Sequence, residues 1–415
     1  MTDRSRSMFP ACLAIATLSV ALTYGQSAQP AGPPFSLEIE TTPTPAGPQS
    51  SAPHLSVSGN GALLSWVESS GASASLKFSE STPTGWAAAR TAASGTNWFV
   101  NWADVPSVIR LAGGTLVAHW LQKSGPGTYA YDVRLSYSND GGKTWKPSFV
   151  PHHDGTATEH GFVSMFGMPG GGLGLVWLDG RAMTGGHDAG HQAAGDMSIR
   201  FSAYDANWKQ IADAALDGRV CECCPTTVAM TSDGPLIAYR DRSANEVRDI
   251  HVTRLENGKW TPPVAVHDDN WRVPACPVNG PALSARGRDV AVAWFMAKDD
   301  RPQSFLAFSS DAGRTFGSPV RLDDEASLGR VDVELLPDGS ALASYVEFAR
   351  QRAGFRVRRV TRSGERSAPM TVAGVVGNRT SGLPRMALHG DQLLFAWVDR
   401  DGGSSVVRTA RARVK

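Results

Sequence analysis

Four cysteines in the second half of the chain are spaced so that they can react or bind together. They are Cys221, Cys223, Cys224 and Cys276. In an exported protein, an even number of cysteines favours disulfide bonds. Thiolates also bind Zn2+ and Cu(I), and a histidine such as His160, His187 or His191 would complete a metal site. The run Cys-x-Cys-Cys with one distant cysteine is not a common zinc-binding spacing. Disulfide bonds are therefore favoured, and a bound metal is the alternative. No other cofactor is expected.

Carboxylates at a repeated position form a second set of candidates. Seven apolar segments each end in an aromatic residue, and in five of them the residue two positions further is acidic. These residues are Glu68, Asp179, Asp241, Glu347 and Asp399. The recurrence favours a structural carboxylate that pairs with neighbouring groups. Asp179 and Asp241 have additional charged neighbours, which are Arg181, His187 and Asp188 for the first and Arg240 and Arg242 for the second.

The apolar segments that precede these positions form an internal repeat. They cover residues 63–66, 116–120, 173–177, 236–239, 290–294, 341–345 and 393–397, and their aromatic residues are 54, 57, 62, 55, 51 and 52 residues apart. A period of roughly 50 residues has room for about four short strands, as in a propeller blade. We therefore predict an all-β protein, a β-propeller of seven four-stranded blades, with a six-bladed ring or an open solenoid as alternatives.

The two ends of the chain are expected to close this ring. After Trp397 only one strand remains, residues 405–414, so the seventh blade lacks its outermost strand. Residues 35–40 alternate between apolar and polar side chains and are predicted to supply it. The predicted organisation is a signal peptide at 1–25, a linker with the closing strand at 26–50, and one propeller domain at 51–415.

Composition and charge exclude several functional classes. The chain has 40 Lys plus Arg against 39 Asp plus Glu, a net charge of +1, so nucleic acid is not an expected partner. Arg4 and Arg6 precede an uncharged run over residues 8–22, which is typical of a secretory signal. We therefore expect a secreted or periplasmic protein with no membrane insertion once the signal is removed.

Two short segments carry a further motif. Residues 138–145 and 309–316 both read S-x-D-x-G-x-T-aromatic, the Asp-box. In this motif the Asp accepts backbone N–H bonds across a hairpin turn, and the Gly permits a positive φ. Across nearly the whole mature chain, the sequence thereby resembles the sialidase superfamily, the neuraminidase-like propellers with BNR repeats. The box is informative about the fold and says nothing about activity.

The resemblance implies an exo-α-sialidase that removes a terminal sialic acid. In that family three arginines hold the sugar carboxylate, a tyrosine attacks, a glutamate activates it and an aspartate is the acid/base. On the matching segments, the catalytic candidates are Asp188, Asp179, Glu159 and Tyr129, with Tyr131 and Tyr345 as further tyrosines. The substrate-binding candidates are Arg181, Arg240, Arg242, Arg330, Arg385 and His160. Asp104 stands where the family's first arginine motif has its arginine.

These candidates are expected on one face of the propeller. Loops that enter each innermost strand, and loops that follow each second strand, surround the central channel there. Cys276 enters its blade at the place equivalent to Cys223 and Cys224 in the preceding blade, so it is expected to lie close to one of them. A glycan or another acidic small molecule is the expected partner. The rival hypothesis is a non-catalytic binding or assembly propeller with a cysteine-lined metal or partner site.

Overall fold

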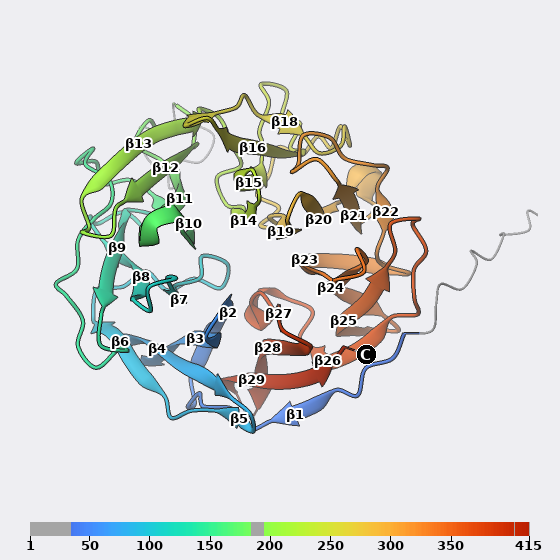
Figure 1. Ribbon diagram of the computed structural model, residues 1–415, viewed down its shortest axis with the longest axis horizontal. Coiled ribbons are helices and arrows are strands. Elements are labelled where there is room, and N and C mark those ends of the chain that lie inside the picture. Colours follow the sequence, from blue (N-terminus) through green and yellow to red (C-terminus); the bar gives the residue numbers. More distant parts are fainter. Residues whose placement is uncertain (1–34, 184–194, 402, 415) are drawn as a thin grey trace, which may run out of the picture. The chain divides into compact units, whose positions relative to one another are not determined.

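The computed structural model describes residues 35–183, 195–401 and 403–414, which belong to one compact unit, Ala31–Lys415. Seven antiparallel sheets follow one another around a ring, and in each the innermost strand is the first of its own repeat (Figure 1). This confirms the predicted seven-bladed, all-β propeller. Among the described residues, no helix is long and apolar enough to cross a membrane.

The first three blades follow the chain in order. The first comprises β2 (Ser50–Ser58), β3 (Gly61–Ser70), β4 (Ser73–Thr82), β5 (Gly85–Trp86) and β6 (Arg90–Gly95). The second comprises β7 (Ser107–Arg110), β8 (Leu116–Lys123) and β9 (Tyr131–Ser138). The third comprises β10 (His160–Gly167), β11 (Leu173–Asp179), β12 (Ser198–Tyr204) and β13 (Gln210–Asp217), with the short helical turn η1 (Pro169–Gly171) between its first two strands.

The remaining blades continue the same pattern. The fourth comprises β14 (Thr227–Thr231), β15 (Gly234–Arg240), β16 (Ile250–Glu256), β17 (Lys259–Trp260) and β18 (Val264–Ala265). The fifth comprises β19 (Ala282–Arg286), β20 (Asp289–Met296), β21 (Gln303–Ser309) and β22 (Val320–Arg321), with η3 (Lys298–Asp300). The sixth comprises β23 (Ala326–Leu335), β24 (Ala341–Ala349), β25 (Arg352–Val360) and β26 (Met370–Val375). The seventh comprises η4 (Arg379–Ser381), β27 (Arg385–His389), β28 (Gln392–Asp401), β29 (Ser404–Arg413) and β1 (Glu40–Thr42).

The N-terminal strand closes the seventh blade, as predicted. β1 pairs with β29, and the register joins Glu40 to Arg411 and Thr42 to Thr409. The hydroxyls of Thr42 and Thr409 are 2.8 Å apart and buried. The ladder lies further along the chain than the predicted strand at 35–40, because Leu37 packs into the blade core and is only 6% exposed. The ring therefore has no open edge at the junction of its ends.

The second blade departs from the four-stranded pattern. Its fourth strand is reduced to one isolated bridge, in which Leu135 and Phe149 exchange backbone hydrogen bonds of 2.8 and 2.9 Å. Pro147 and Pro151 flank this bridge, and proline has no N–H to donate to a ladder. The segment that follows leaves the ladder until Glu159, which forms an isolated bridge with Tyr131 of β9, and this segment contributes to the site below.

The repeated aromatic residues fill the space between blades. Trp66, Trp177 and Trp294 have no solvent exposure. The Asp-box stabilises a hairpin on the outer side, where Asp140 Oδ1 accepts the backbone N–H groups of Lys143 and Thr144 at 3.0 and 2.9 Å. The Thr144 hydroxyl, which donates to Asp140 Oδ2 at 2.6 Å, and these N–H groups lower the pKa of Asp140 well below its usual range. The box is thus a folding element, as the sequence indicates.

Candidate functional site

The central channel contains a polar cavity of about 160 Å³. The innermost strand of every blade contributes at least one residue to its wall. The polar side chains in the wall are His54, Ser107, Ser164, Thr226, Thr227, Asp332 and Arg385. A channel formed by all seven blades is a fixed, concave site, and such sites are where small ligands bind in propellers.

Arg385 is the cationic residue of this cavity. It begins β27, and its buried Nε has no hydrogen-bond partner among the described residues. Burial lowers its pKa, and the carboxylate of Asp332 partly offsets this. Asp332 itself is held by the backbone N–H groups of Val333 and Met386, both at 3.0 Å. The guanidinium of Arg385 therefore has donors that the described protein does not use.

Arg330 lies next to Arg385. The two residues line one small pocket, together with Asn279 and Pro384. The Arg330 guanidinium donates to the carbonyl oxygen of Asn378 at 2.8 Å and lies over the ring of Trp102 at 5.5 Å. Burial lowers its pKa to about 10, so it is still cationic at neutral pH. The structure thus brings two of the five arginine candidates into one place.

Arg240 and Arg242 lie elsewhere. Arg240 is 1% exposed and donates to the backbone oxygens of three residues at 2.6–2.9 Å, which are Asn279, Arg248 and Phe295. It therefore crosslinks the fourth and fifth blades from inside the protein. Arg242 pairs with Glu222 and Glu246 near the cysteines. Neither guanidinium lines the channel cavity.

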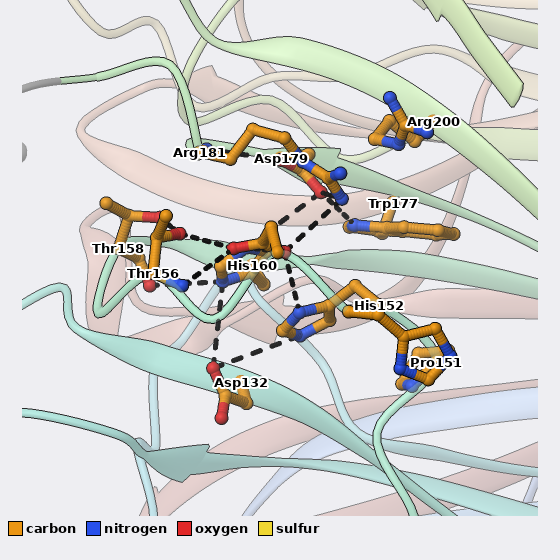
Figure 2. A network of polar contacts seen from close by, with 12 residues as sticks. Asp132, Pro151, His152, Thr156, Thr158, His160, Trp177, Asp179, Arg181 and Arg200 are labelled. Carbon is orange, nitrogen blue, oxygen red and sulfur yellow. Dashed lines mark hydrogen bonds and ion pairs between the residues drawn. The ribbon is translucent and has the colours of Figure 1, made fainter. Parts of the chain in front are cut away.

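A second polar cluster lies at one end of the third blade. His160 begins β10, Asp179 ends β11, and the two are register partners (Figure 2). Asp179 accepts the indole N–H of Trp177 at 2.8 Å and two guanidinium N–H groups of Arg181 at 2.6 and 2.7 Å. Glu68 accepts the indole N–H of Trp66 in the same way, at 2.9 Å. The repeated carboxylate therefore has the structural role that its recurrence indicates.

Three residues that sequence reasoning did not select complete this cluster: Asp132, His152 and Asp154. The rings of His152 and His160 stack at 3.8 Å, between Asp132 and Asp179 (Figure 2). His160 Nε2 is 3.2 Å from Asp154 Oδ2. Burial alone would lower the pKa of His160, but Asp154 and Asp179 more than offset this and raise it. The run His-His-Asp at 152–154, on a segment outside the repeat, was the available signal.

The tyrosine and glutamate candidates meet inside the protein. Tyr131 Oη is 2.8 Å from Glu159 Oε1 and 3.1 Å from Asp104 Oδ2. The ring of Tyr131 is fully buried beneath Phe99, whose ring centroid is 4.1 Å away. Burial and the two carboxyl groups raise the pKa of Tyr131 well above its usual value. This environment opposes a phenolate nucleophile.

The remaining catalytic candidates are placed less centrally or lie outside the described residues. Tyr129 packs beside Phe99, with ring centroids 5.9 Å apart. Tyr345 is fully buried between blades. Asp188, His187 and His191 lie outside the described residues.

The cysteines gather where the fourth and fifth blades begin. Cys221 and Cys224 are joined by a disulfide. Cys223 is a buried thiol, 3.9 Å from Cys221 Sγ, and Cys276 is an exposed thiol. The hydrogen bond between Cys223 and Cys276, followed by burial, raises the pKa of Cys223. Cys276 thus lies beside Cys223, across the blade boundary, as equivalent positions in neighbouring blades require.

Peptide mapping tests this arrangement. In the native protein, Cys221 and Cys224 are expected to resist alkylation, and mild oxidation is expected to join peptides 220–240 and 273–286 through Cys223 and Cys276, since these thiols are adjacent. Cys276→Ser should abolish the link between the peptides and leave Cys223 open to alkylation after partial denaturation. A link from Cys276 to Cys221 or Cys224, or free labelling of all four thiols, would contradict the pairing.

Comparison with known proteins adds information about the fold alone. No protein-family model and no curated protein matches the sequence. The structure of the polysaccharide lyase Uly1 is similar with a TM-score of 0.52 and 11% identity, over 88% of this chain and 90% of that one. The phage phi92 endosialidase has a TM-score of 0.51 and 8% identity, over 92% of this chain and 70% of that one. The NanB sialidase from Streptococcus pneumoniae has a TM-score of 0.46 and 9% identity, over 85% of this chain and 83% of that one.

Proposed function

We propose that this chain is an exported, glycan-directed propeller that binds the carboxylate of an acidic sugar through Arg385 and Arg330. The observation that carries the proposal is the Arg385 guanidinium, which faces the channel cavity with donors that no described residue uses. A polysaccharide lyase and an endosialidase share the fold, which supports a carbohydrate ligand. Sialic acid and uronic acids are the sugar classes that carry the required carboxylate.

The electrostatics favour a local contact over long-range attraction. The net charge of +1 provides little field to attract an anion, so affinity has to come from groups inside the cavity. A guanidinium binds a carboxylate in a bidentate manner, which gives both strength and orientation. Burial, together with Arg385, lowers the pKa of His54 to about 3, so this residue is neutral. Its buried Nδ1 has no described partner and is available to a sugar hydroxyl.

Hydrolysis of a terminal sialic acid is the enzymatic form of this proposal. It would use Asp188 as the acid/base, with Asp179 and Glu159 as the other catalytic carboxylates, and it needs a tyrosine that reaches the sugar. The buried position of Tyr131 favours a second candidate, a propeller that binds acidic glycans without cleaving them. A fluorogenic sialoside distinguishes these candidates, because only the hydrolase releases the fluorophore.

Calorimetric titration tests the shared part of the proposal. Sialyllactose or a glucuronate-containing disaccharide is expected to bind, whereas lactose does not. Arg385→Ala should weaken binding about 30-fold, corresponding to about 2 kcal/mol, because the guanidinium contacts the carboxylate directly. Arg385→Lys should lose less binding affinity than Arg385→Ala, since lysine keeps the positive charge but cannot form the bidentate contact.

The control for this test is an arginine far from any cavity wall. Arg301 is 73% exposed at its side chain and pairs with Asp299 on the η3 turn, so Arg301→Ala should bind like the wild type. Equal binding of lactose and sialyllactose by the wild type would refute carboxylate recognition. So would full binding by Arg385→Ala.

A further inference from the structure

Three ligating atoms converge in the third-blade cluster. Asp154, His160 and Asp179 each offer one ligand atom, and these atoms lie within 4.8 Å of one another. His152 Nδ1 is 3.0 Å from Asp154 Oδ2, the oxygen that also faces His160. Two histidines and two carboxylates are a ligand set that suits a divalent metal of the zinc class.

Each of the three side chains is oriented by a partner at its other polar atom. His160 Nδ1 is 3.2 and 3.3 Å from the carbonyl oxygens of Thr158 and Tyr131, so the ring hydrogen belongs on Nδ1. The Oδ1 atom of Asp154 accepts the backbone N–H of Thr156 at 3.0 Å. The Oδ1 atom of Asp179 accepts from Arg181, at 2.6 Å. Partners of this kind hold the ligands of metal sites in position.

One histidine nitrogen that faces Asp154 and Asp179 has no hydrogen-bond partner among the described residues: Nε2 of His160, a residue that is 0% exposed. His152 faces the same place with Nδ1, which is 3.0 Å from Asp154 Oδ2, and its buried Nε2 lies on the side of Asp132. The nearest carboxylate oxygen to His160 Nε2 is Asp154 Oδ2, at 3.2 Å, a contact of the ion-pair kind. A buried imidazole nitrogen beside carboxylate oxygens is stabilised when a cation lies between them.

The charges leave room for such a cation. Asp132, Asp154 and Asp179 bring three carboxylates into contact with the two histidines. Arg181 pairs with two of them: its Nε is 2.6 Å from Asp179 Oδ1, and its Nη2 is 3.3 Å from Asp154 Oδ2. Two largely buried carboxylates thus share one guanidinium, and a further cation beside them would be stabilised, because carboxylates in excess of their cations are costly away from water.

We propose that this cluster binds one Zn2+ through Asp154, His160 and Asp179, with His152 as the fourth ligand. The ion would connect the segment between β9 and β10 to the ends of β10 and β11. It would thereby fix the loop that replaces the missing fourth strand of the second blade. This proposal does not depend on recognition of acidic sugars by Arg385.

Metal analysis of the full-length mature protein tests the site. After treatment with a chelator and reloading with ZnSO4, the wild type is expected to retain one equivalent of zinc through gel filtration and to show a higher Tm than the metal-free protein. His152→Gln should bind zinc at least about 10-fold more weakly, and Asp154→Asn should lose both the bound zinc and the Tm increase. The matched control is His153→Gln, because His153 is exposed and contacts Gln210 outside the cluster.

Two further measurements keep the result interpretable. Replacement of zinc by Co2+ should give a visible spectrum without a thiolate charge-transfer band, since the ligands are nitrogen and oxygen, whereas binding at the cysteines would produce that band. The Tm of the metal-free variants shows whether they fold. The proposal is overturned if the wild type retains no zinc, if zinc leaves the Tm unchanged, if His152→Gln binds like the control, or if the cobalt spectrum shows thiolate ligands. The cluster would then be an ion-pair network only.

Discussion

Removal of residues 26–45 is expected to lower the free energy of unfolding by at least about 3 kcal/mol. The deletion exposes the edge of β29, where β1 now pairs from Glu40 to Thr42. It also removes Leu37, whose burial contributes roughly 2 kcal/mol, and several backbone hydrogen bonds that contribute about 1 kcal/mol each. Denaturant unfolding, followed by tryptophan fluorescence, measures the loss.

Point variants separate the contributions to ring closure. Leu37→Ala should cost about 2 to 3 kcal/mol, because it leaves a cavity among the buried side chains of the sixth and seventh blades. Glu40→Ala should change the stability by less than about 0.5 kcal/mol, since its exposed carboxylate forms a surface ion pair with Arg411. If the truncated protein is as stable as the full chain, side-chain packing between blades closes the ring and the N-terminal strand does not.

The propeller architecture could be predicted from the sequence because every blade buries its second strand in the same way, which repeats the same residue pattern. The second strand of a blade is covered on both faces, so it contains an apolar segment that ends in an aromatic residue such as Trp177, which is fully buried. The closing strand was placed too early for a related reason. The alternation over residues 35–40 reflects packing of Leu37 and Ile39 against the core, whereas the ladder begins only at Glu40.

The candidate site could be predicted from the sequence only in part, because a repeat indicates where a strand ends but not where a side chain points. Arg240 and Arg385 both occupy strand ends near the channel face. Arg240 lies inside the protein, held by three carbonyl oxygens, whereas Arg385 lines the cavity. His152 and Asp154 come from a segment that has no equivalent in other blades, so no comparison between repeats could select them. Their proximity to Asp179 is a result of tertiary structure.

Asp104→Asn is expected to make the protein much less sensitive to rising pH. Asp104 is fully buried, and burial raises its pKa from 3.8 to about 8 despite the N–H of Phe162. The folded state therefore keeps a proton that the unfolded state loses above about pH 4. Stability from this group is fully present below the unfolded pKa, and it decreases by about 1.4 kcal/mol per pH unit until the folded pKa is passed.

An asparagine reproduces the contacts of the protonated acid. A phenol has one hydrogen, and Tyr131 is nearer to Glu159 Oε1, at 2.8 Å, than to Asp104 Oδ2, at 3.1 Å. Tyr131 therefore donates to Glu159, and protonated Asp104 donates to Tyr131, as an Asn amide would. The Asn oxygen would still accept the Phe162 N–H, which is 2.7 Å from Asp104 Oδ1.

The measurement is the difference in unfolding free energy between Asp104→Asn and the wild type from pH 5 to pH 8. Between these limits the difference should shift in favour of the variant by about 4 kcal/mol, because only the wild type must ionise a buried carboxyl group. Other acids with a raised pKa, such as Glu334, cancel in this difference because both proteins contain them. Asp391→Asn is the control, since that side chain is 67% exposed and its charge is solvated in both states. A pH-independent difference for Asp104→Asn would show that Asp104 is ionised in the folded protein, and the hydrogen-bond order through Tyr131 to Glu159 would then be reversed.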